Sequence, residues 1–178
     1  DPAVDGGVKV AAHPGGGFLL AWARGASNAD AWGQRLDASG ASLGASFPIS
    51  IAPSAQNQLA LAPAGADVAV VWRNAADLYG TRIDATGAVL DTRLEGTTTV
   101  GGIALVTSLD AQSRPAISCD GAGCVVAWQD RRDAMTNFSD IYTQAFSHAL
   151  VATGSEAPTF AIARAQQAPK LTVGGAGI

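Results

Sequence analysis

The side chains best suited to bind a ligand gather in one polar segment, QDRRDAMTNFSD, which spans residues 129–140. Its candidate ligand-binding residues are Asp130, Arg131, Arg132, Asp133, Asn137 and Asp140. Carboxylate oxygens are preferred ligands of Ca²⁺, so Asp130, Asp133 and Asp140 form a candidate calcium site, although their spacing matches no defined calcium-binding loop. We favour a solvated loop in which the Asp and Arg side chains form ion pairs with one another. The sequence predicts no other metal or cofactor site.

A second chemical signal is an Asp that recurs at the same place in three similar segments, as Asp30, Asp77 and Asp140. We favour the interpretation that each Asp caps a loop by accepting backbone N–H bonds. The alternative is a ring of ligands. An enzyme of glycosidase or lyase type would use gathered carboxylates and arginines, and its first candidates would be Asp30, Asp77, Asp140 and Arg131.

Known catalytic motifs do not occur in the sequence. His13 and His148 lie in predicted turns without metal-binding or nucleophile spacing, and we expect both at the surface. The glycines at 15–17 indicate a hairpin turn rather than a phosphate-binding loop, because no helix is predicted after them. We therefore predict no catalytic residue and favour a protein that is not an enzyme.

The two cysteines, Cys119 and Cys124, are separated by Asp-Gly-Ala-Gly. If these four residues form a hairpin turn, the cysteines face each other on adjacent strands with Cβ atoms roughly 4.5–5.5 Å apart. A slight adjustment would bring them within reach of a disulfide; the alternative is a pair of buried thiols. A disulfide indicates an oxidising compartment, so we expect an extracellular, periplasmic or cell-surface protein.

The composition favours short strands and tight turns over helices. Hydrophobic residues make up 48% of the 178 residues, glycine occurs 21 times, and only 15% of residues are charged. The net charge is −4 and no basic run exceeds Arg131-Arg132, so we expect no binding to nucleic acid. The apolar runs are too short for a membrane-spanning helix.

Internal repetition is the strongest structural signal in the sequence. Three stretches of fifteen residues each contain two apolar segments, separated by a Gly-rich turn, and end in Trp. They are VKVAAHPGGGFLLAW at 8–22, QLALAPAGADVAVVW at 58–72 and RPAISCDGAGCVVAW at 114–128. Each stretch predicts a strand, a turn and a second strand.

The second half of each repeat predicts two more strands. After a polar loop come the recurrent Asp, an aromatic residue two places on, and a turn, within residues 29–44, 76–91 and 139–154. Asp-Ala-Ser-Gly at 37–40 and Asp-Ala-Thr-Gly at 84–87 are typical of tight turns. The third copy has Ser-His-Ala-Leu at 147–150, so we expect a longer or different turn there. The final strands are predicted within 43–50, 89–96 and 158–163.

Four-stranded antiparallel meanders that repeat at this interval are typical of β-propeller blades. The terminal Trp residues of successive units lie 50 and 56 residues apart. We therefore predict one all-β domain, 1–178, with about three full blades and the start of a fourth, as a partial or oligomer-completed propeller. The blades are expected at 8–50, 58–96, 114–163 and, in part, 169–178. The predicted structural core contains Trp22, Trp72, Trp128, Trp32, Tyr79 and Tyr142.

The repeated form, with ADLYGTRID and SDIYTQAF after the Trp and its polar loop, resembles propeller-type repeats of large secreted and surface proteins of bacteria. The resemblance covers nearly the whole chain and implies a propeller, while it implies little about function. Kelch and WD40 repeats match less well, because their double glycine and Gly-His…Trp-Asp patterns are not kept. The segment 118–128 is similar to a sialidase Asp-box only superficially, because Trp128 comes too late after Ser118.

Three functional hypotheses are compatible with the sequence. The first is a non-catalytic, secreted or cell-surface repeat module that binds a protein or glycan or acts as a scaffold. The second is a fragment of an enzyme propeller. The third is a self-assembling subunit, in which the strand edge at 169–178 pairs with a second polypeptide. Since PKLTVGGAGI repeats the start of the third unit, we expect a fragment of a longer propeller or, failing that, self-association through this edge.

Overall fold

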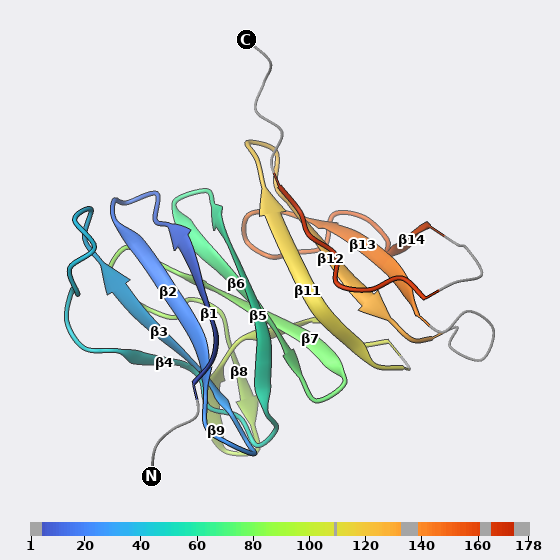
Figure 1. The fold of residues 1–178 in the computed structure, drawn as a ribbon, viewed down its shortest axis with the longest axis horizontal. Helices are drawn as coiled ribbons and strands as arrows, with labels where there is room; N and C mark the ends of the chain where they lie inside the picture. Colours follow the sequence, from blue (N-terminus) through green and yellow to red (C-terminus); the bar gives the residue numbers. More distant parts are fainter. Residues whose placement is uncertain (1–4, 109, 133–138, 161–164, 173–178) are drawn as a thin grey trace.

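The computed structural model describes residues 5–108, 110–132, 139–160 and 165–172 (Figure 1). Strands form all the regular secondary structure of these residues, so the chain is all-β as predicted. Three four-stranded antiparallel sheets and one two-stranded ribbon are present in this part of the chain. The same residues contain no helix long and apolar enough to cross a membrane.

The three sheets, which we call units one, two and three, form a row that runs from left to right in Figure 1. Unit one has the order β1-β2-β3-β4, with β1 (Asp5–Ala12), β2 (Phe18–Arg24), β3 (Asp30–Leu36) and β4 (Phe47–Ser50). Unit two has the order β10-β7-β6-β5, with β5 (Gln56–Ala64), β6 (Asp67–Asn74), β7 (Asp77–Ile83) and β10 (Ile103–Val106). Unit three has the order β11-β12-β13-β14, with β11 (Gln112–Cys119), β12 (Cys124–Asp130), β13 (Asp140–Phe146) and β14 (Ala157–Phe160). The ribbon consists of β8 (Thr92–Glu95) and β9 (Thr98–Gly101).

Each unit begins with the predicted hairpin, and its terminal Trp faces an aromatic residue of the third strand. The pairs are Trp22 with Trp32, Trp72 with Tyr79, and Trp128 with Tyr142. Side chains directly opposite each other in an antiparallel pair lie on the same face, so aromatic pairs stabilise the sheet. The spacing from Trp to the recurrent Asp differs between units, yet the register is the same, because the intervening loops absorb the difference in length.

The fourth strand of unit two is not the segment that the sequence predicted. Residues 89–96 contain β8, which pairs with β9, whereas β10 pairs with β7. The reason is an inserted hairpin whose two ends meet: the Gly102 N–H donates to the Asp91 carbonyl at 2.7 Å. The chain leaves the sheet after Asp91 and returns after Gly102, so unit two extends to β10 rather than ending at residue 96.

The turn after the third strand is the same in all three units, so the prediction of a different turn in unit three was wrong. The N–H of Asp37, Asp84 and Ser147 donates to the carbonyl four residues on, at 2.8, 3.1 and 2.8 Å. Gly40 and Gly87 adopt φ of 86° and 92°, and Leu150 adopts 57° at the equivalent place. Leu150 is buried in the core of unit three, which offsets the cost of a left-handed backbone for a residue with a Cβ.

The first strand of each unit contains a β-bulge near its start, where the pairing register shifts. The residues with positive φ there are Gly7, Gln58 and Arg114, at 42°, 55° and 51°. Ala168 repeats this conformation with φ of 51°. The predicted fourth unit therefore begins with the same backbone geometry, although none of residues 165–172 belongs to a strand. Its remaining residues, 173–178, lie outside the described part of the chain.

One backbone hydrogen bond links each unit to the chain segment that follows it. In each case the donor is the N–H of a Gln, and the acceptor is the carbonyl just before the recurrent Asp. The bonds join Gln56 to Ala29, Gln112 to Ala76 and Gln166 to Ser139, at 2.6, 2.7 and 2.8 Å. Residues 165–172 therefore attach to unit three in the way that β11 attaches to unit two.

Two apolar cores lie between the sheets. The core between units one and two includes Leu19 and Trp72, and the core between units two and three includes Val71 and Trp128. Trp72 and Trp128 are 0% exposed. Tyr142 is also buried, while Trp22, Trp32 and Tyr79 are half-buried. Burial of these residues between neighbouring sheets supplies the apolar contact that one sheet alone could not provide.

Candidate functional site

The charged segment after β12 is organised by Arg132. Its guanidinium donates to both carboxylate oxygens of Asp130, at 3.0 and 2.7 Å, and to those of Glu156, at 2.8 and 3.0 Å. It also bonds Ser108 and lies over the Tyr142 ring, 4.1 Å from the ring centroid. The network joins the segment before β11, the end of β12, and the loop that precedes β14.

Asp130 is buried, and its carboxylate is fully engaged within this network. It accepts hydrogen bonds from the Trp128 indole N–H at 2.9 Å and from the Arg132 backbone N–H at 2.8 Å. Burial raises the pKa of Asp130, but the hydrogen bonds from Arg132 and Trp128 outweigh it and hold the pKa below its ordinary value. The hydrogen bond from Arg132 likewise lowers the pKa of Glu156. Both carboxylates thus act as charged partners of one guanidinium.

The other candidates in this segment are placed differently. Arg131 is exposed, Asp140 is buried opposite Asp130 in the β12–β13 pair, and Asp133 and Asn137 lie outside the described residues. Within the described ranges, no group of three or more His, Cys, Asp or Glu residues is arranged to hold a metal ion. Around Asp130, the geometry is that of an internal Asp–Arg pair.

The recurrent Asp residues occupy the first position of the third strand in every unit. Asp30 pairs in register with Arg24, and Asp77 with Asn74. Burial raises the pKa of Asp30. The residue before each Asp accepts the hydrogen bond that links one unit to the next segment, so this corner of the sheet carries the junction between units.

An arginine lies over the third-strand aromatic residue of every unit, which sequence reasoning missed. The guanidinium carbons of Arg24, Arg93 and Arg132 lie 4.6, 4.2 and 4.1 Å from the ring centroids of Trp32, Tyr79 and Tyr142. Arg24 and Arg132 come from the end of the second strand or the loop after it, whereas Arg93 comes from the inserted ribbon. Because the arginines do not share one sequence position, the repeat alignment could not reveal them.

The sequence predicted that His13 lies at the surface, but in the structure it is buried. It is buried where unit one meets unit two: its Nδ1 accepts from the Gly15 N–H at 3.0 Å, and its Nε2 lies 3.3 Å from the Ile83 carbonyl oxygen. Since Nδ1 is an acceptor, the proton resides on Nε2, which donates to Ile83. The residue serves a contact between sheets.

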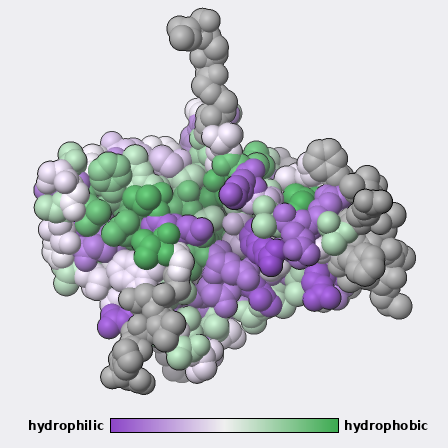
Figure 2. Space-filling model, viewed as in Figure 1, coloured by the Kyte–Doolittle hydropathy of each residue, from purple (hydrophilic) through white to green (hydrophobic). Residues whose placement is uncertain are grey.

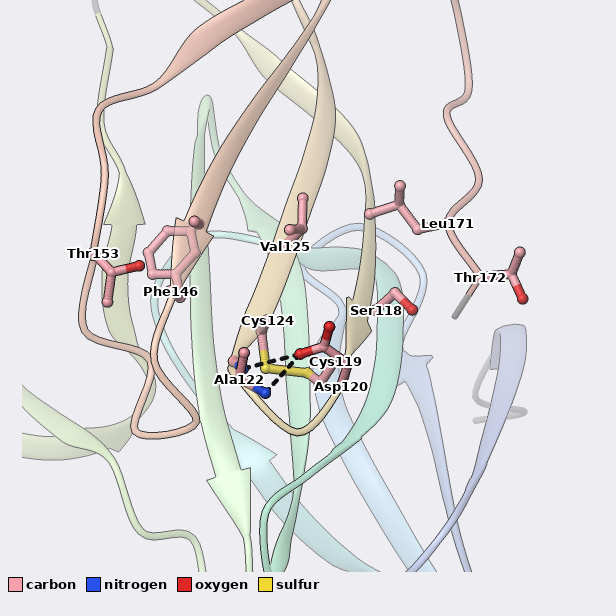
Figure 3. A pocket seen from close by; sticks show the side chains of 12 residues that line it. Ser118, Cys119, Asp120, Ala122, Cys124, Val125, Phe146, Thr153, Leu171 and Thr172 are labelled. Carbon is pink, nitrogen blue, oxygen red and sulfur yellow. Dashed lines mark hydrogen bonds between the residues drawn. A yellow bond between two sulfur atoms is a disulfide. The ribbon is translucent and has the colours of Figure 1, made fainter. Parts of the chain in front are cut away.

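The disulfide between Cys119 and Cys124 is present, as predicted, and closes the β11–β12 hairpin. Asp120 organises the turn by accepting hydrogen bonds from the N–H groups of Ala122 and Gly123, at 2.8 and 3.2 Å. A groove of about 530 Å³ lies beside this hairpin, and Figure 3 shows Val125, Phe146 and Leu171 around it. Its lining contains one carboxylate, Asp120, whose oxygen is engaged by the turn.

A second groove, of about 540 Å³, lies along the first strands of all three units, where β1 contacts β5 and β5 contacts β11. Residues 168–171 form its remaining wall. Its charged lining residues are Lys9, Arg114 and Lys170, and its lining includes no Asp or Glu. We call it the first-strand groove.

The first-strand groove was missed at the sequence level, although a signal existed. Both lysines of the sequence lie two residues after the bulge position, Lys9 after Gly7 and Lys170 after Ala168. In an acidic chain, the placement of both lysines at one position of the repeat indicates a shared location. Arg114 is held within the groove by hydrogen bonds: its N–H donates to the Gln58 side chain at 2.7 Å, and its guanidinium to Gln167 at 3.1 Å.

Comparison with known proteins adds no assignment: no family model and no curated protein matches this sequence.

Proposed function

We propose that this chain is a row of β-propeller blades from a secreted or cell-surface protein, and that it binds an acidic peptide segment of another protein in the first-strand groove. The observation that carries the proposal is the convergence of Lys9, Arg114 and Lys170 on one groove. The disulfide supports an oxidising compartment. The repeated four-stranded sheets, packed face to face with their first strands adjacent, support the propeller arrangement.

Charge favours an anionic ligand. The chain carries a net charge of −4, yet three cationic side chains and no carboxylate line the groove. A groove lined by one sign of charge attracts the opposite charge and raises its local concentration. An anion in the groove would meet charges of opposite sign, although the chain as a whole is acidic.

The apolar part of the lining favours a peptide over a glycan. Leu61, Pro115 and Ile117 line the groove, and its lining contains no Trp, Tyr or Phe. Sugar rings commonly stack on aromatic faces, whereas aliphatic peptide side chains pack against aliphatic walls. A segment that alternates carboxylate and aliphatic side chains fits both features.

The test uses a fluorescein-labelled, alternating Glu-Leu octapeptide and measures its binding by fluorescence anisotropy. Matched Gln-Leu and Lys-Leu peptides and an oligogalacturonate are the comparison ligands. We expect the Glu-Leu peptide to bind best and its affinity to fall with added salt. Removing two exposed charges together, in Lys9→Ala/Lys170→Ala, should weaken binding on the order of tenfold.

Arg131→Ala is the matched control, because it removes an exposed cation that does not line the groove. It should bind the Glu-Leu peptide like the unmodified chain. Equal binding of the Glu-Leu and Gln-Leu peptides, or full binding by the double lysine variant, would overturn the proposal. Preferential binding of oligogalacturonate would overturn the assignment to a peptide and identify an acidic glycan as the ligand.

A further inference from the structure

The attachment of residues 165–172 to unit three repeats the attachment of β11 to unit two. In both places a Gln N–H donates to the carbonyl before the recurrent Asp, from Gln112 at 2.7 Å and from Gln166 at 2.8 Å. Two residues after each Gln, the backbone adopts a φ of 51°, at Arg114 and at Ala168. Ala168 therefore lies against unit three as Arg114 lies against unit two.

The junction between units two and three shows which acceptor the backbone N–H at this position takes. The Arg114 N–H donates to the side-chain Oε1 of Gln58 at 2.7 Å. Gln58 is the residue of unit two that corresponds to Arg114, because each lies two residues after the first residue of its strand and has a positive φ. The N–H at the bulge of one unit is thus accepted by the side chain at the bulge of the unit before it.

At the next junction, the chain supplies donors on both sides. Unit three presents Arg114 to Ala168 where unit two presents Gln58 to Arg114, and a guanidinium has five N–H donors and no acceptor. The Ala168 N–H has no hydrogen-bond partner among the described residues. The Arg114 side chain extends to the same segment, because its Nη1 donates to the Gln167 side chain at 3.1 Å. The Ala168 N–H and the remaining guanidinium N–H groups are therefore neighbouring donors that need an acceptor.

The surroundings of these donors favour a carboxylate as the acceptor. Both groups line the first-strand groove, together with Lys9 and Lys170 and with no Asp or Glu. Figure 2 shows hydrophilic side chains (purple) gathered in the middle of this face, over β5 and β11. The two oxygens of a carboxylate accept two parallel bonds from a guanidinium and keep lone pairs for a backbone N–H. Such charge-assisted hydrogen bonds are roughly twice as strong as neutral ones.

We propose that a side-chain carboxylate of the ligand binds between the Arg114 guanidinium and the Ala168 N–H, in the place that the Gln58 side-chain oxygen takes at the preceding junction. The position lies in the first-strand groove, so this inference rests on the proposed function. Arg114 then determines specificity, because its planar fork selects a carboxylate by shape. Lys9 and Lys170 attract the ligand as point charges.

The first test separates shape from charge at residue 114. Arg114→Lys keeps the positive charge but loses the fork, so it should weaken binding of the Glu-Leu octapeptide, with an amidated C-terminus, about tenfold. Fluorescence anisotropy measures the affinity. Lys9→Arg is the matched control, because it also exchanges one cation for another in the same groove. It should bind the peptide like the unmodified chain.

Arg114→Gln makes this junction a copy of the preceding one. Its amide oxygen should accept the Ala168 N–H, as Gln58 accepts the Arg114 N–H, and so occupy the carboxylate position from within the chain. Peptide binding should fall further than in Arg114→Lys, and the NMR signal of the Ala168 amide proton should lie downfield without any ligand. Gln58 has the same backbone conformation, so the variant should keep the urea midpoint of the unmodified chain.

The Ala168 amide signal also reports directly on the ligand. In the unmodified chain it should move downfield when the Glu-Leu peptide or sodium acetate is added, and stay in place with the same concentration of sodium chloride. In Arg114→Gln it should respond to neither ligand. Equal binding of a Gln-Leu peptide with a free C-terminus would overturn the assignment to a side-chain carboxylate and identify a terminal carboxylate as the group recognised.

The two proposals fail in different ways. Full affinity of Arg114→Lys for the Glu-Leu peptide, or an Ala168 signal that stays in place while the peptide binds, would overturn the carboxylate position and leave the proposed function standing. Absence of peptide binding by the unmodified chain would overturn the proposed function. In that case an Ala168 signal that moves with acetate would still support the carboxylate position, and one that does not move would overturn it as well.

Discussion

Arg132 links residues that lie far apart in the sequence, Ser108, Asp130 and Glu156. We predict that Arg132→Ala lowers the free energy of unfolding by about 2–4 kcal/mol, because the buried Asp130 carboxylate would lose its charged partner. Urea denaturation followed by tryptophan fluorescence measures this loss. Arg131→Ala, next to it but exposed, should change the free energy by less than about 0.5 kcal/mol. Equal effects of the two variants would contradict a specific role for Arg132.

The same network makes stability depend on pH on the acid side. The pKa values of Asp130 and Glu156 lie below their ordinary values of 3.8 and 4.5. As the pH falls, the unfolded chain binds protons at these groups before the folded chain does, so the folded state loses stability. The contribution should be complete above about pH 5 and decline as the pH falls below about 4.5.

Glu156→Gln removes the contribution of Glu156 to this pH dependence and leaves that of Asp130. The difference in unfolding free energy between the unmodified chain and the variant should be largest near neutral pH and shrink in acid, where Glu156 becomes protonated. Thermal or urea denaturation between pH 3 and pH 7 measures it. A difference that stays constant over this range would show that the carboxylate charge contributes nothing.

At the scale of elements, the turn that recurs after each third strand allows the stabilities of an Ala and a Gly variant at one position, residue 150, to be compared. Leu150 has positive φ, so Leu150→Ala keeps the backbone strain, whereas Leu150→Gly removes it. Both variants lose a side chain that is 2% exposed, at a cost of about 2–3 kcal/mol. We predict that the Gly variant is more stable than the Ala variant by about 1 kcal/mol, although Ala usually stabilises relative to Gly.

Gly40→Ala is the control for this comparison. It occupies the same place in unit one, and a Cβ added there would meet no atom within 4 Å. The substitution therefore tests the backbone alone and should cost about 1 kcal/mol in urea denaturation. If Leu150→Ala proved more stable than Leu150→Gly, the third turn would not be strained.

At the scale of the whole molecule, position in the row decides what a repeated residue contributes. Trp72 is 0% exposed between two sheets, whereas Trp22, at the same position of unit one, is half-buried. We predict that Trp72→Ala lowers the free energy of unfolding by about 3–5 kcal/mol and Trp22→Ala by less than about 2 kcal/mol. Urea denaturation of dilute, monomeric protein measures both losses. Similar losses of unfolding free energy in the two variants would contradict the prediction that position in the row decides what each Trp contributes.

Several features were predictable because they depend on residues close together in the chain. The hairpins that end in Trp22, Trp72 and Trp128 were predictable because each consists of two apolar segments on either side of a Gly-rich turn. The Cys119–Cys124 bridge was predictable because a tight turn brings its two flanking positions together. The Asp130–Arg132 pair, two residues apart, was among the alternatives for the same reason.

The remaining features depend on contacts between distant residues. Residues 89–96 have a strand-like pattern, but the bond between Gly102 and Asp91 decides that β10 completes the sheet. The first-strand groove exists because β1 lies beside β5 and β5 lies beside β11, which brings together Lys9 and Arg114.

By itself, the sequence determined an all-β chain of repeated hairpins closed in one place by a disulfide, because strand periodicity and turn chemistry are local. The tertiary structure alone decided that one tryptophan of the repeat is half-buried while two are fully enclosed. It also decided which cations share a groove. The physical reason is that burial and electrostatic environment depend on which sheet packs against which. Similar local sequences do not specify which sheets will lie next to them.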